Sequence, residues 1–236
     1  MTMPAPPHID QLFFATVAAL AACFLYGQWR LADASAPARV RALATGLAVV
    51  ALWLGVSGVL AASGAISDFS RLPPPFVMMM LGYAAATVAL AFSPLGTRLA
   101  RRAPLAALVG YQVFRVPVEI FLHEGYEHGL LPVQMTWSGM NFDVVSGLTA
   151  GALGLYALRR EPPRALVLAW NALGLALLAN IVVVAFLSTP SPLRVFANEP
   201  ANTIVAAFPY VWLPAFLVQG ALFGHVIVFR WAARRG

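Results

Sequence analysis

Two charged residues, Arg115 and Glu119, stand in an otherwise apolar segment and are the side chains best placed to do chemistry inside a membrane. If the segment is helical, polar residues recur three or four positions apart and form one polar stripe: Gln112, Arg115, Glu119, His123 and Glu127. A charge near the centre of a bilayer costs about 2.5 to 3.5 kcal/mol on insertion scales. We therefore expect the stripe to face the protein interior, with Arg115 and Glu119 forming a mutually compensating pair.

A polar, aromatic loop follows this segment and supplies further candidates. Asn141 and Asp143 fit two interpretations equally: the cap and first-turn acid of the next helix, or ligand contacts. Asn180 is expected at the same depth in the membrane as Glu119. Each lies about fifteen or sixteen residues after the start of its predicted helix, and both helices are expected to run from the cytoplasm outward. Asn171, nine positions before Asn180, is expected on the opposite helical face. The predicted ligand-binding residues are Gln112, Arg115, Glu119, Asn141, Asp143 and Asn180.

Metal binding is the alternative chemistry for the same region. Glu119 with His123, and Glu124 with His128, are each four positions apart and could supply ligand pairs. The two histidines are five positions apart, however, and diverge by about 140° on one helix. His225 is expected far away, at the cytoplasmic end of its helix. We predict no metal and no cofactor, and keep one alternative metal set: Glu119, His123, Glu124 and His128.

The composition indicates a polytopic membrane protein. Of 236 residues, 61% are hydrophobic and 10% are charged, with a mean hydropathy of +0.79. The net charge of +6 would suggest nucleic acid in a soluble chain, but these arginines flank apolar runs, so we predict contact with membrane lipid and no nucleic-acid partner. The chain has no lysine, which excludes a retinal Schiff base. Its single cysteine, Cys23, excludes an intrachain disulfide.

Seven apolar runs are long enough to cross about 30 Å of hydrocarbon. We expect an all-α bundle of seven transmembrane helices in a single domain, residues 1–236, with helices at 11–29, 41–63, 75–93, 104–123, 143–158, 165–187 and 209–229. Twelve arginines follow the odd-numbered runs, and only Arg71 and Arg194 lie in the other connections. The positive-inside rule then places the N-terminus outside and the C-terminus in the cytoplasm. The first run follows no basic segment, so we interpret it as a retained span.

Glycine and proline positions predict local features of the backbone. Small residues four positions apart favour close helix packing at Ala51 with Gly55 and at Gly147 with Gly151. Pro214 is expected one turn into the last helix, where it would leave a backbone carbonyl four residues earlier without a partner.

The C-terminal half resembles an uncharacterised family of bacterial seven-helix integral membrane proteins. The segments that carry the resemblance are FRVPVEIFLHEGYEHGLLPVQMTWSGMNFDVVSGLTA, LANIVVVAFLSTPSP and FPYVWLPAFLVQGALFGHVIVFR. The family's MT-aromatic-x-G-x-NFD pattern matches residues 135–143. Further residues that fit its pattern are Arg115, Glu119, Pro132, Trp212, Pro214 and His225. This chain departs at Ser138 and Met140, where an acidic and a basic residue are usual. The resemblance implies a multi-pass protein of the bacterial inner membrane and supplies no activity.

Three functions are compatible with these residues. The leading hypothesis is binding or transport of a small ligand that enters from the outer side and meets Arg115, Glu119, Asn180 and the NFD turn. The second is a membrane-embedded enzyme, such as a metal-dependent hydrolase, in which Glu119 acts as an acid or base. The third is a non-catalytic accessory protein in which Arg115 and Glu119 only hold the bundle together.

Overall fold

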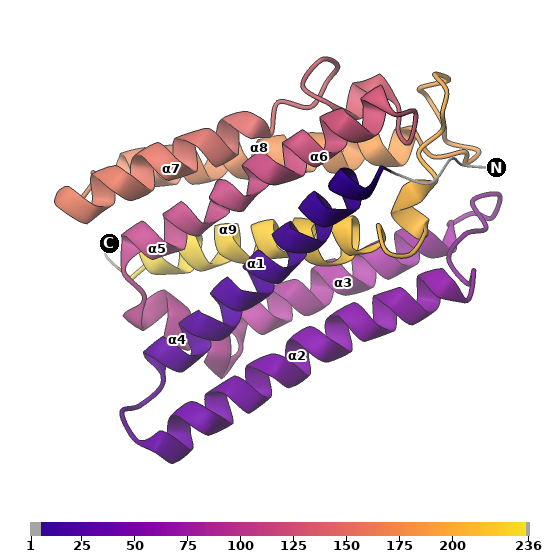
Figure 1. Cartoon of the computed structure of the whole chain (residues 1–236). Helices are drawn as coiled ribbons and strands as arrows, with labels where there is room; N and C mark the ends of the chain where they lie inside the picture. Colours follow the sequence, from indigo (N-terminus) through magenta and orange to yellow (C-terminus); the bar gives the residue numbers. More distant parts are fainter. Residues whose placement is uncertain (1–5, 235–236) are drawn as a thin grey trace.

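A computed structural model describes residues 6–234, and within this range the regular structure is entirely helical. Six helices are long and apolar enough to cross a membrane, and they lie side by side in Figure 1: α1 (Pro7–Leu31), α2 (Ala36–Ala62), α3 (Pro75–Phe92), Leu105–Glu127, α8 (Arg164–Leu187) and Leu213–Ala232. A seventh apolar helix, α7 (Val144–Arg159), has 16 residues. At about 1.5 Å per residue, α7 is about 24 Å long, which is shorter than a typical hydrocarbon layer.

Two of the long helices change their winding along their length. Leu105–Glu127 consists of α5 (Leu105–Gly110), the 3-10 helix η1 (Tyr111–Phe114) and α6 (Arg115–Glu127). The last helix begins with the π-helical turn η4 (Leu213–Leu217) and continues as α9 (Val218–Ala232). The expected effect of Pro214 is wrong, because the Tyr210 carbonyl accepts from the Leu213 backbone N–H at 2.9 Å. Pro214 lies in the first turn of the helix, where a missing N–H costs little.

A short helix, α4 (Pro94–Arg102), was not predicted and forms most of the connection after α3. The Ser93 side chain accepts from the Gly96 backbone N–H at 3.5 Å, at the start of the helix. Arg98, Arg101 and Arg102 therefore lie on a helix and not in a loose loop, and Arg102 donates to the Leu31 carbonyl at the end of α1 at 3.1 Å.

The helix α9 lies at the centre of the bundle, where it packs against α3, α8, α4 and α5 (Figure 1). Glycines permit the close approach of α5 and α7: a Cβ atom at Gly154 would lie 2.9 Å from the Gly110 Cα. Gly147 likewise faces Val116 of α6: a Cβ atom at Gly147 would lie 2.8 Å from Val116 Cγ2. By contrast, a Cβ at Gly55 would meet nothing within 4 Å, so the contact predicted there is not made within the part of the chain that the structure describes.

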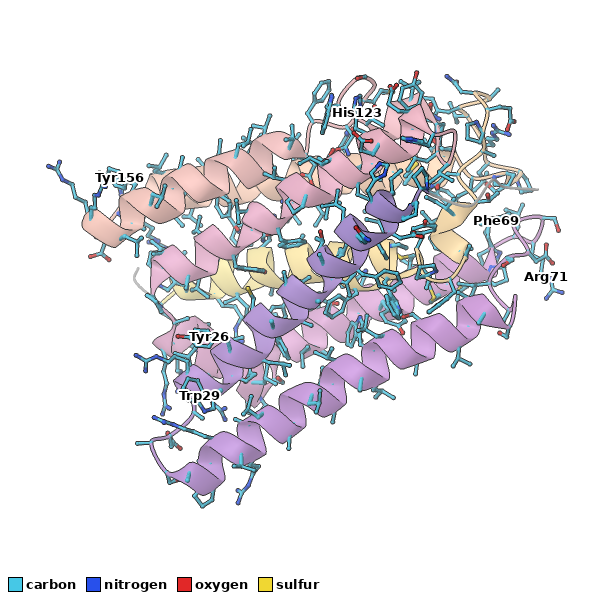
Figure 2. All side chains as sticks on the ribbon, in the orientation of Figure 1. Tyr26, Trp29, Phe69, Arg71, His123 and Tyr156 are labelled. Carbon is cyan, nitrogen blue, oxygen red and sulfur yellow. The ribbon has the colours of Figure 1, made fainter. Side chains whose placement is uncertain are left out.

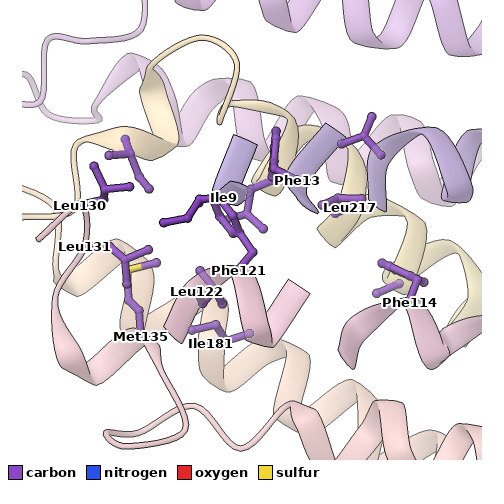
Figure 3. Packing of buried hydrophobic residues seen from close by; sticks show 14 of the residues in the cluster. Ile9, Phe13, Phe114, Phe121, Leu122, Leu130, Leu131, Met135, Ile181 and Leu217 are labelled. Atoms are coloured by element: carbon purple, nitrogen blue, oxygen red, sulfur yellow. The ribbon is translucent and has the colours of Figure 1, made fainter. Parts of the chain in front are cut away.

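An apolar core joins α1 to α6 and to the loop that follows α6. Figure 3 shows Phe13 packed against Phe121, with a ring-centroid distance of 4.8 Å, and Leu131 and Met135 in the same cluster. Tyr210 adds a polar link, since its hydroxyl donates to the Asp10 carboxylate at 2.6 Å. Burial, followed by this hydrogen bond, raises the pKa of Tyr210 above its ordinary value, so the phenol remains a donor.

The connection between α6 and α7 folds into the bundle and does not stay at its surface. It contains the 3-10 helix η2 (Val133–Met135), and Leu131, Thr136 and Asn141 are fully buried. Irregular backbone is tolerated at membrane depth where protein surrounds it. Figure 1 shows that α7 starts well short of the end of the bundle at which α1 begins. The short α7 and the inward loop together place Asp143 inside the bundle, where its side chain is 7% exposed.

Candidate functional site

Arg115, at the start of α6, forms a buried ion pair with Asp143, at the start of α7. Its Nε donates to Asp143 Oδ2 at 2.7 Å, and its Nη2 donates to Asp143 Oδ1, so the contact is bidentate. Nη2 also lies 3.3 Å from the Gly174 carbonyl of α8. A Cβ at Gly174 would lie 2.6 Å from the His225 ring, so a glycine is required for α8 to approach these side chains. The Asp143 carboxylate makes no capping bond to α7 and instead compensates the charge of Arg115.

His225 completes the surroundings of Arg115 and is held in one tautomer by its partners. Arg115 Nη1 lies 2.9 Å from His225 Nε2, and because a guanidinium only donates, Nε2 must accept. The proton of the neutral imidazole is therefore on Nδ1, which lies 2.9 Å from Asn171 Oδ1. Asn171 Nδ2 in turn donates to the His225 carbonyl at 3.0 Å, which fixes the orientation of the amide.

The placement of His225 corrects the sequence analysis. The prediction that it lies at one end of its helix is wrong, since it lies in the middle of α9 (Val218–Ala232), with its side chain fully buried beside Arg115 and Asn171. Asn171 was not among the predicted ligand-binding residues. One feature of the sequence could have identified Asn171 and His225: each is a polar residue within a long apolar run, and such residues are candidates for a functional site.

Glu119 lies one turn beyond Arg115 and contacts Asn141 of the inward loop. Asn141 Nδ2 lies 2.8 Å from Glu119 Oε1 and 2.7 Å from Oε2, and 3.1 Å from the Met135 carbonyl. Asn141 Oδ1 accepts from the Asp143 backbone N–H at 3.1 Å. The expected pair of Arg115 with Glu119 is wrong, because the loop brings a second carboxylate, Asp143, into the geometry that the planar guanidinium takes bidentately.

The charges of this buried polar cluster do not balance. Its members are Arg115, Glu119, Asn141, Asp143, Asn171 and His225. The cluster contains one guanidinium, one neutral imidazole and two carboxyl groups, and among residues 6–234 no basic side chain forms a salt bridge with Glu119. An isolated carboxylate is costly to bury. A proton or an external cation must therefore accompany Glu119.

A cavity of about 260 Å³ adjoins the cluster and is lined by Arg115, Glu119 and Asp143 among otherwise apolar side chains. Two of its lining residues, Leu81 of α3 and Val183 of α8, are 60% and 54% exposed on the outside of the bundle. The cavity therefore opens sideways between α3 and α8, with the π-helical turn η4 in its wall. Glu119 therefore lines a cavity that reaches the outside of the bundle.

The remaining predicted ligand-binding residues lie apart from Glu119. Gln112 is fully buried and donates to the Ala221 carbonyl of α9 at 3.0 Å. Asn180 is half-buried and donates to the Met140 carbonyl at 2.7 Å, which ties the loop to α8. The structure thus brings together four of the six predicted residues: Arg115, Glu119, Asn141 and Asp143.

The alternative metal set is dispersed. The His123 ring stacks on Trp137 with a centroid distance of 4.3 Å. His128 Nδ1 bonds the Glu124 backbone carbonyl at 2.8 Å, and Glu124 Oε2 lies 3.7 Å from the His8 ring. Within residues 6–234, no three His, Cys, Asp or Glu side chains gather in an arrangement that could hold a metal ion.

The fold and the site define a polytopic helical membrane protein with a buried polar cluster beside a laterally open cavity. The family model of a domain of unknown function (DUF8737) matches residues 74–233, and the chain belongs to this family. The matched range contains α3 to α9, and with them every residue of the buried polar cluster, whereas α1 and α2 precede it. No curated protein and no solved structure matches the chain.

Proposed function

We propose that this is a seven-span protein of the bacterial inner membrane that binds, and carries across its outer half, a small ligand at Glu119. The observation that carries the proposal is that the Glu119 carboxylate lines an apolar cavity and that, within residues 6–234, its side-chain hydrogen-bonding partner is one amide, Asn141. A carboxylate in such a place favours a ligand with a positively charged or hydrogen-bond-donating head and an apolar body.

Arg115 and Asp143 have a positioning role in this proposal. The five N–H groups of a guanidinium are nearly all used here: Nε and Nη2 meet Asp143, Nη2 also meets Gly174, and Nη1 meets His225. Arg115 therefore has little capacity left for an anionic ligand. The ion pair fixes the start of α7, and through the Asp143 backbone it fixes Asn141 against Glu119.

Seven crossings with the N-terminus outside remain part of the proposal. In support, α1 begins and α9 ends at opposite ends of the bundle, as an odd number of crossings requires (Figure 1). Figure 2 shows Tyr26, Trp29 and Tyr156 toward one end and Phe69 and Arg71 at the other, as expected for side chains at two membrane interfaces. The arginine asymmetry assigns the end with Tyr26 to the cytoplasm. The cavity beside Glu119 is then in the outer half.

The test uses simple probes of the proposed ligand chemistry. Purified protein is heated with a series of alkylammonium ions and with alkyl sulfonates of the same chain lengths. A ligand that binds only the folded state at about 100 times its Kd stabilises by about 2.7 kcal/mol. We expect the ammonium series to raise the melting temperature and the sulfonates to have no effect. Glu119→Gln should abolish the response.

Glu124→Gln is the matched control, because Glu124 is a half-buried carboxylate on the same helix that faces His8 and not the cavity. This variant should respond like the unmodified protein. Equal stabilisation of the unmodified protein and Glu119→Gln, or equal stabilisation by ammonium and sulfonate, would show that the cavity does not use this carboxylate and would overturn the proposal.

A further inference from the structure

A second and larger cavity, of about 690 Å³, lies at the other end of the bundle, between α1, α2, α3, α4, α5 and α9. Its walls are mostly apolar, and six of its lining residues are exposed on the outside: Cys23, Tyr26 and Arg30 of α1, Arg102 of α4, and Pro104 and Ala107 around the start of α5. Figure 1 shows α1 and α5 diverging toward this end, although α1 packs against α6 at the other. The cavity therefore opens to the membrane between α1 and α5.

Two arginines line the mouth of this cavity, Arg30 at the end of α1 and Arg102 at the end of α4. Arg102 uses Nη1 for the Leu31 carbonyl, at 3.1 Å, and the Asp33 carboxylate, at 2.8 Å. No bond within residues 6–234 engages its Nε and Nη2, and Arg30 forms no salt bridge there. The end of α1, the start of α2 and α4 together carry six arginines, Arg30, Arg39, Arg41, Arg98, Arg101 and Arg102, and Asp33, between α1 and α2, is the one acid in residues 30–41 and 94–102.

In the inner part of the cavity, the polar side chains of Thr87, Gln219 and Tyr111 are hydrogen-bonded within the protein. Thr87 Oγ1 donates to Gln219 Oε1 at 2.9 Å, and Gln219 Nε2 donates to the Pro214 carbonyl at 3.2 Å. The Tyr111 hydroxyl donates to the Gly220 carbonyl at 2.7 Å. Along α1 the lining extends from Leu20 to Leu31, a rise of eleven residues or about 16 Å. The space suits a long apolar chain whose anionic head stays at the arginines.

We propose that this cavity binds one acyl chain of an anionic phospholipid from the leaflet at the arginine-rich end, with the phosphate against Arg30 and Arg102. The lateral opening admits the chain directly from the bilayer, and the unused N–H groups of Arg102 suit a phosphate oxygen pair. The site is separate from the Glu119 cavity, because the two share no lining residue. This proposal is independent of the ligand proposed for Glu119.

The only cysteine of the chain, Cys23, lines this cavity and reports its occupancy. Purified protein in a neutral detergent is treated with N-ethylmaleimide while lysophosphatidylglycerol or lysophosphatidylcholine with the same acyl chain is titrated in. The alkylation rate of Cys23 is measured by mass spectrometry. We expect the anionic lipid to protect Cys23 at a lower concentration. The attraction of an anionic lipid to a basic residue is about 1 kcal/mol, or about five-fold in affinity for each arginine.

Four variants test whether contact of the lipid phosphate with the arginines, and not only filling of the cavity by the acyl chain, protects Cys23. Arg30→Gln and Arg102→Gln should each lower the preference for the anionic lipid about five-fold. Asp33→Asn should raise it, because Arg102 loses its competing carboxylate. Arg160→Gln, an exposed arginine in the connection between α7 and α8, is the matched control and should change nothing. Equal protection by both lipids, or no protection by either, would overturn the proposal. Glu119→Gln should leave Cys23 protection unchanged, so failure at one site does not imply failure at the other.

Discussion

Arg115 and Asp143 are 28 positions apart in the sequence and form a bidentate ion pair inside the bundle, with Nε 2.7 Å from Oδ2. Their side chains are 2% and 7% exposed, so neither charge is solvated by water. The pair neutralises itself, and among residues 6–234 no basic side chain forms a salt bridge with the other buried carboxyl group of the cluster, Glu119. Asp143 is therefore expected to affect mainly stability, and Glu119 mainly ligand binding.

Removing one member of the ion pair should destabilise the bundle strongly. Asp143→Asn leaves the buried guanidinium of Arg115 without its counter-ion, and breaking a buried pair typically costs about 3 to 5 kcal/mol. Replacing both partners, Arg115→Met with Asp143→Leu, should recover most of the loss, because neither member of the ion pair is then left buried without its counter-ion. The free energy of unfolding in mixed micelles is the measurement.

The exposed pair of Asp68 and Arg71 supplies the control for this experiment. It has the same charges, but its side chains are 44% and 73% exposed, so Asp68→Asn should have no measurable effect on unfolding. If Asp143→Asn is as mild as this surface variant, the ion pair does not hold α6 to α7.

The helical segments follow from the sequence because a run of apolar residues in a membrane has few alternatives to a helix. All seven predicted runs are helical, with ends that differ by a few residues; α1, for example, begins at Pro7 and not at residue 11. The inward direction of the polar stripe also follows from helical spacing and holds for Gln112, Arg115 and Glu119. It does not hold for the last two members of the stripe, since His123 is half-buried and Glu127 is exposed.

The partners of these side chains could not be predicted in the same way. Helical periodicity fixes which residues share a face, but not which helix lies opposite or how deeply a loop enters. Asp143 reaches Arg115 because the loop after α6 is buried and α7 is short. His225 and Asn171 meet because α8 and α9 are neighbours in the bundle. These are consequences of tertiary packing, which the local sequence does not encode.

Because α7 is short, whether it crosses the membrane is a prediction that topology mapping can test. Reporter fusions after Arg102 and after Arg160 should report the cytoplasm, and a fusion near Gly139 should report the outer side, because α7 crosses between them. A helix of about 24 Å can cross if the inward loop and the local bilayer accommodate the mismatch. The same location for the fusions near Gly139 and after Arg160 would show that α7 does not cross.

The hydrogen bonds of His225 should couple energetically to those of Asn171. His225→Phe keeps a ring of similar size but leaves one N–H of Arg115 and the oxygen of Asn171 without partners, at about 1 to 3 kcal/mol for each stranded group. Adding Asn171→Leu removes one of these stranded groups, so the double variant should be more stable than the two single losses predict. A double-mutant cycle on unfolding measures the coupling, expected at about 0.5 to 3 kcal/mol.

The exposed His128 provides the comparison: within residues 6–234 its ring bonds the Glu124 carbonyl on its own helix and contacts the His8 ring, and neither partner belongs to the buried cluster. His128→Phe should leave the unfolding free energy nearly unchanged and should show no coupling to Asn171→Leu. Strict additivity of His225→Phe and Asn171→Leu would contradict an energetically significant hydrogen bond between the two side chains.

The contact between Asn141 and Glu119 can be tested by exchanging the amide and the carboxylate between the two positions. Asn141→Asp alone removes the donor from Glu119 and sets a second carboxylate against it, which should lower stability by about 1 to 3 kcal/mol or more. Combining it with Glu119→Gln restores one amide facing one carboxylate, with the acid moved from α6 to the loop. Unfolding experiments should show that the exchanged pair recovers most of the stability of the original protein.

The exchanged pair also separates a structural role of Glu119 from a binding role. If the acid and the amide only satisfy one another, their positions are interchangeable, and the exchanged protein should respond to alkylammonium ions like the original. We expect instead that stability returns while the alkylammonium response stays weak, because Glu119 lines the cavity and Asn141 does not. A full response in the exchanged protein would refute the assignment of the ligand to Glu119 and would favour an accessory protein whose polar cluster only holds the helices together.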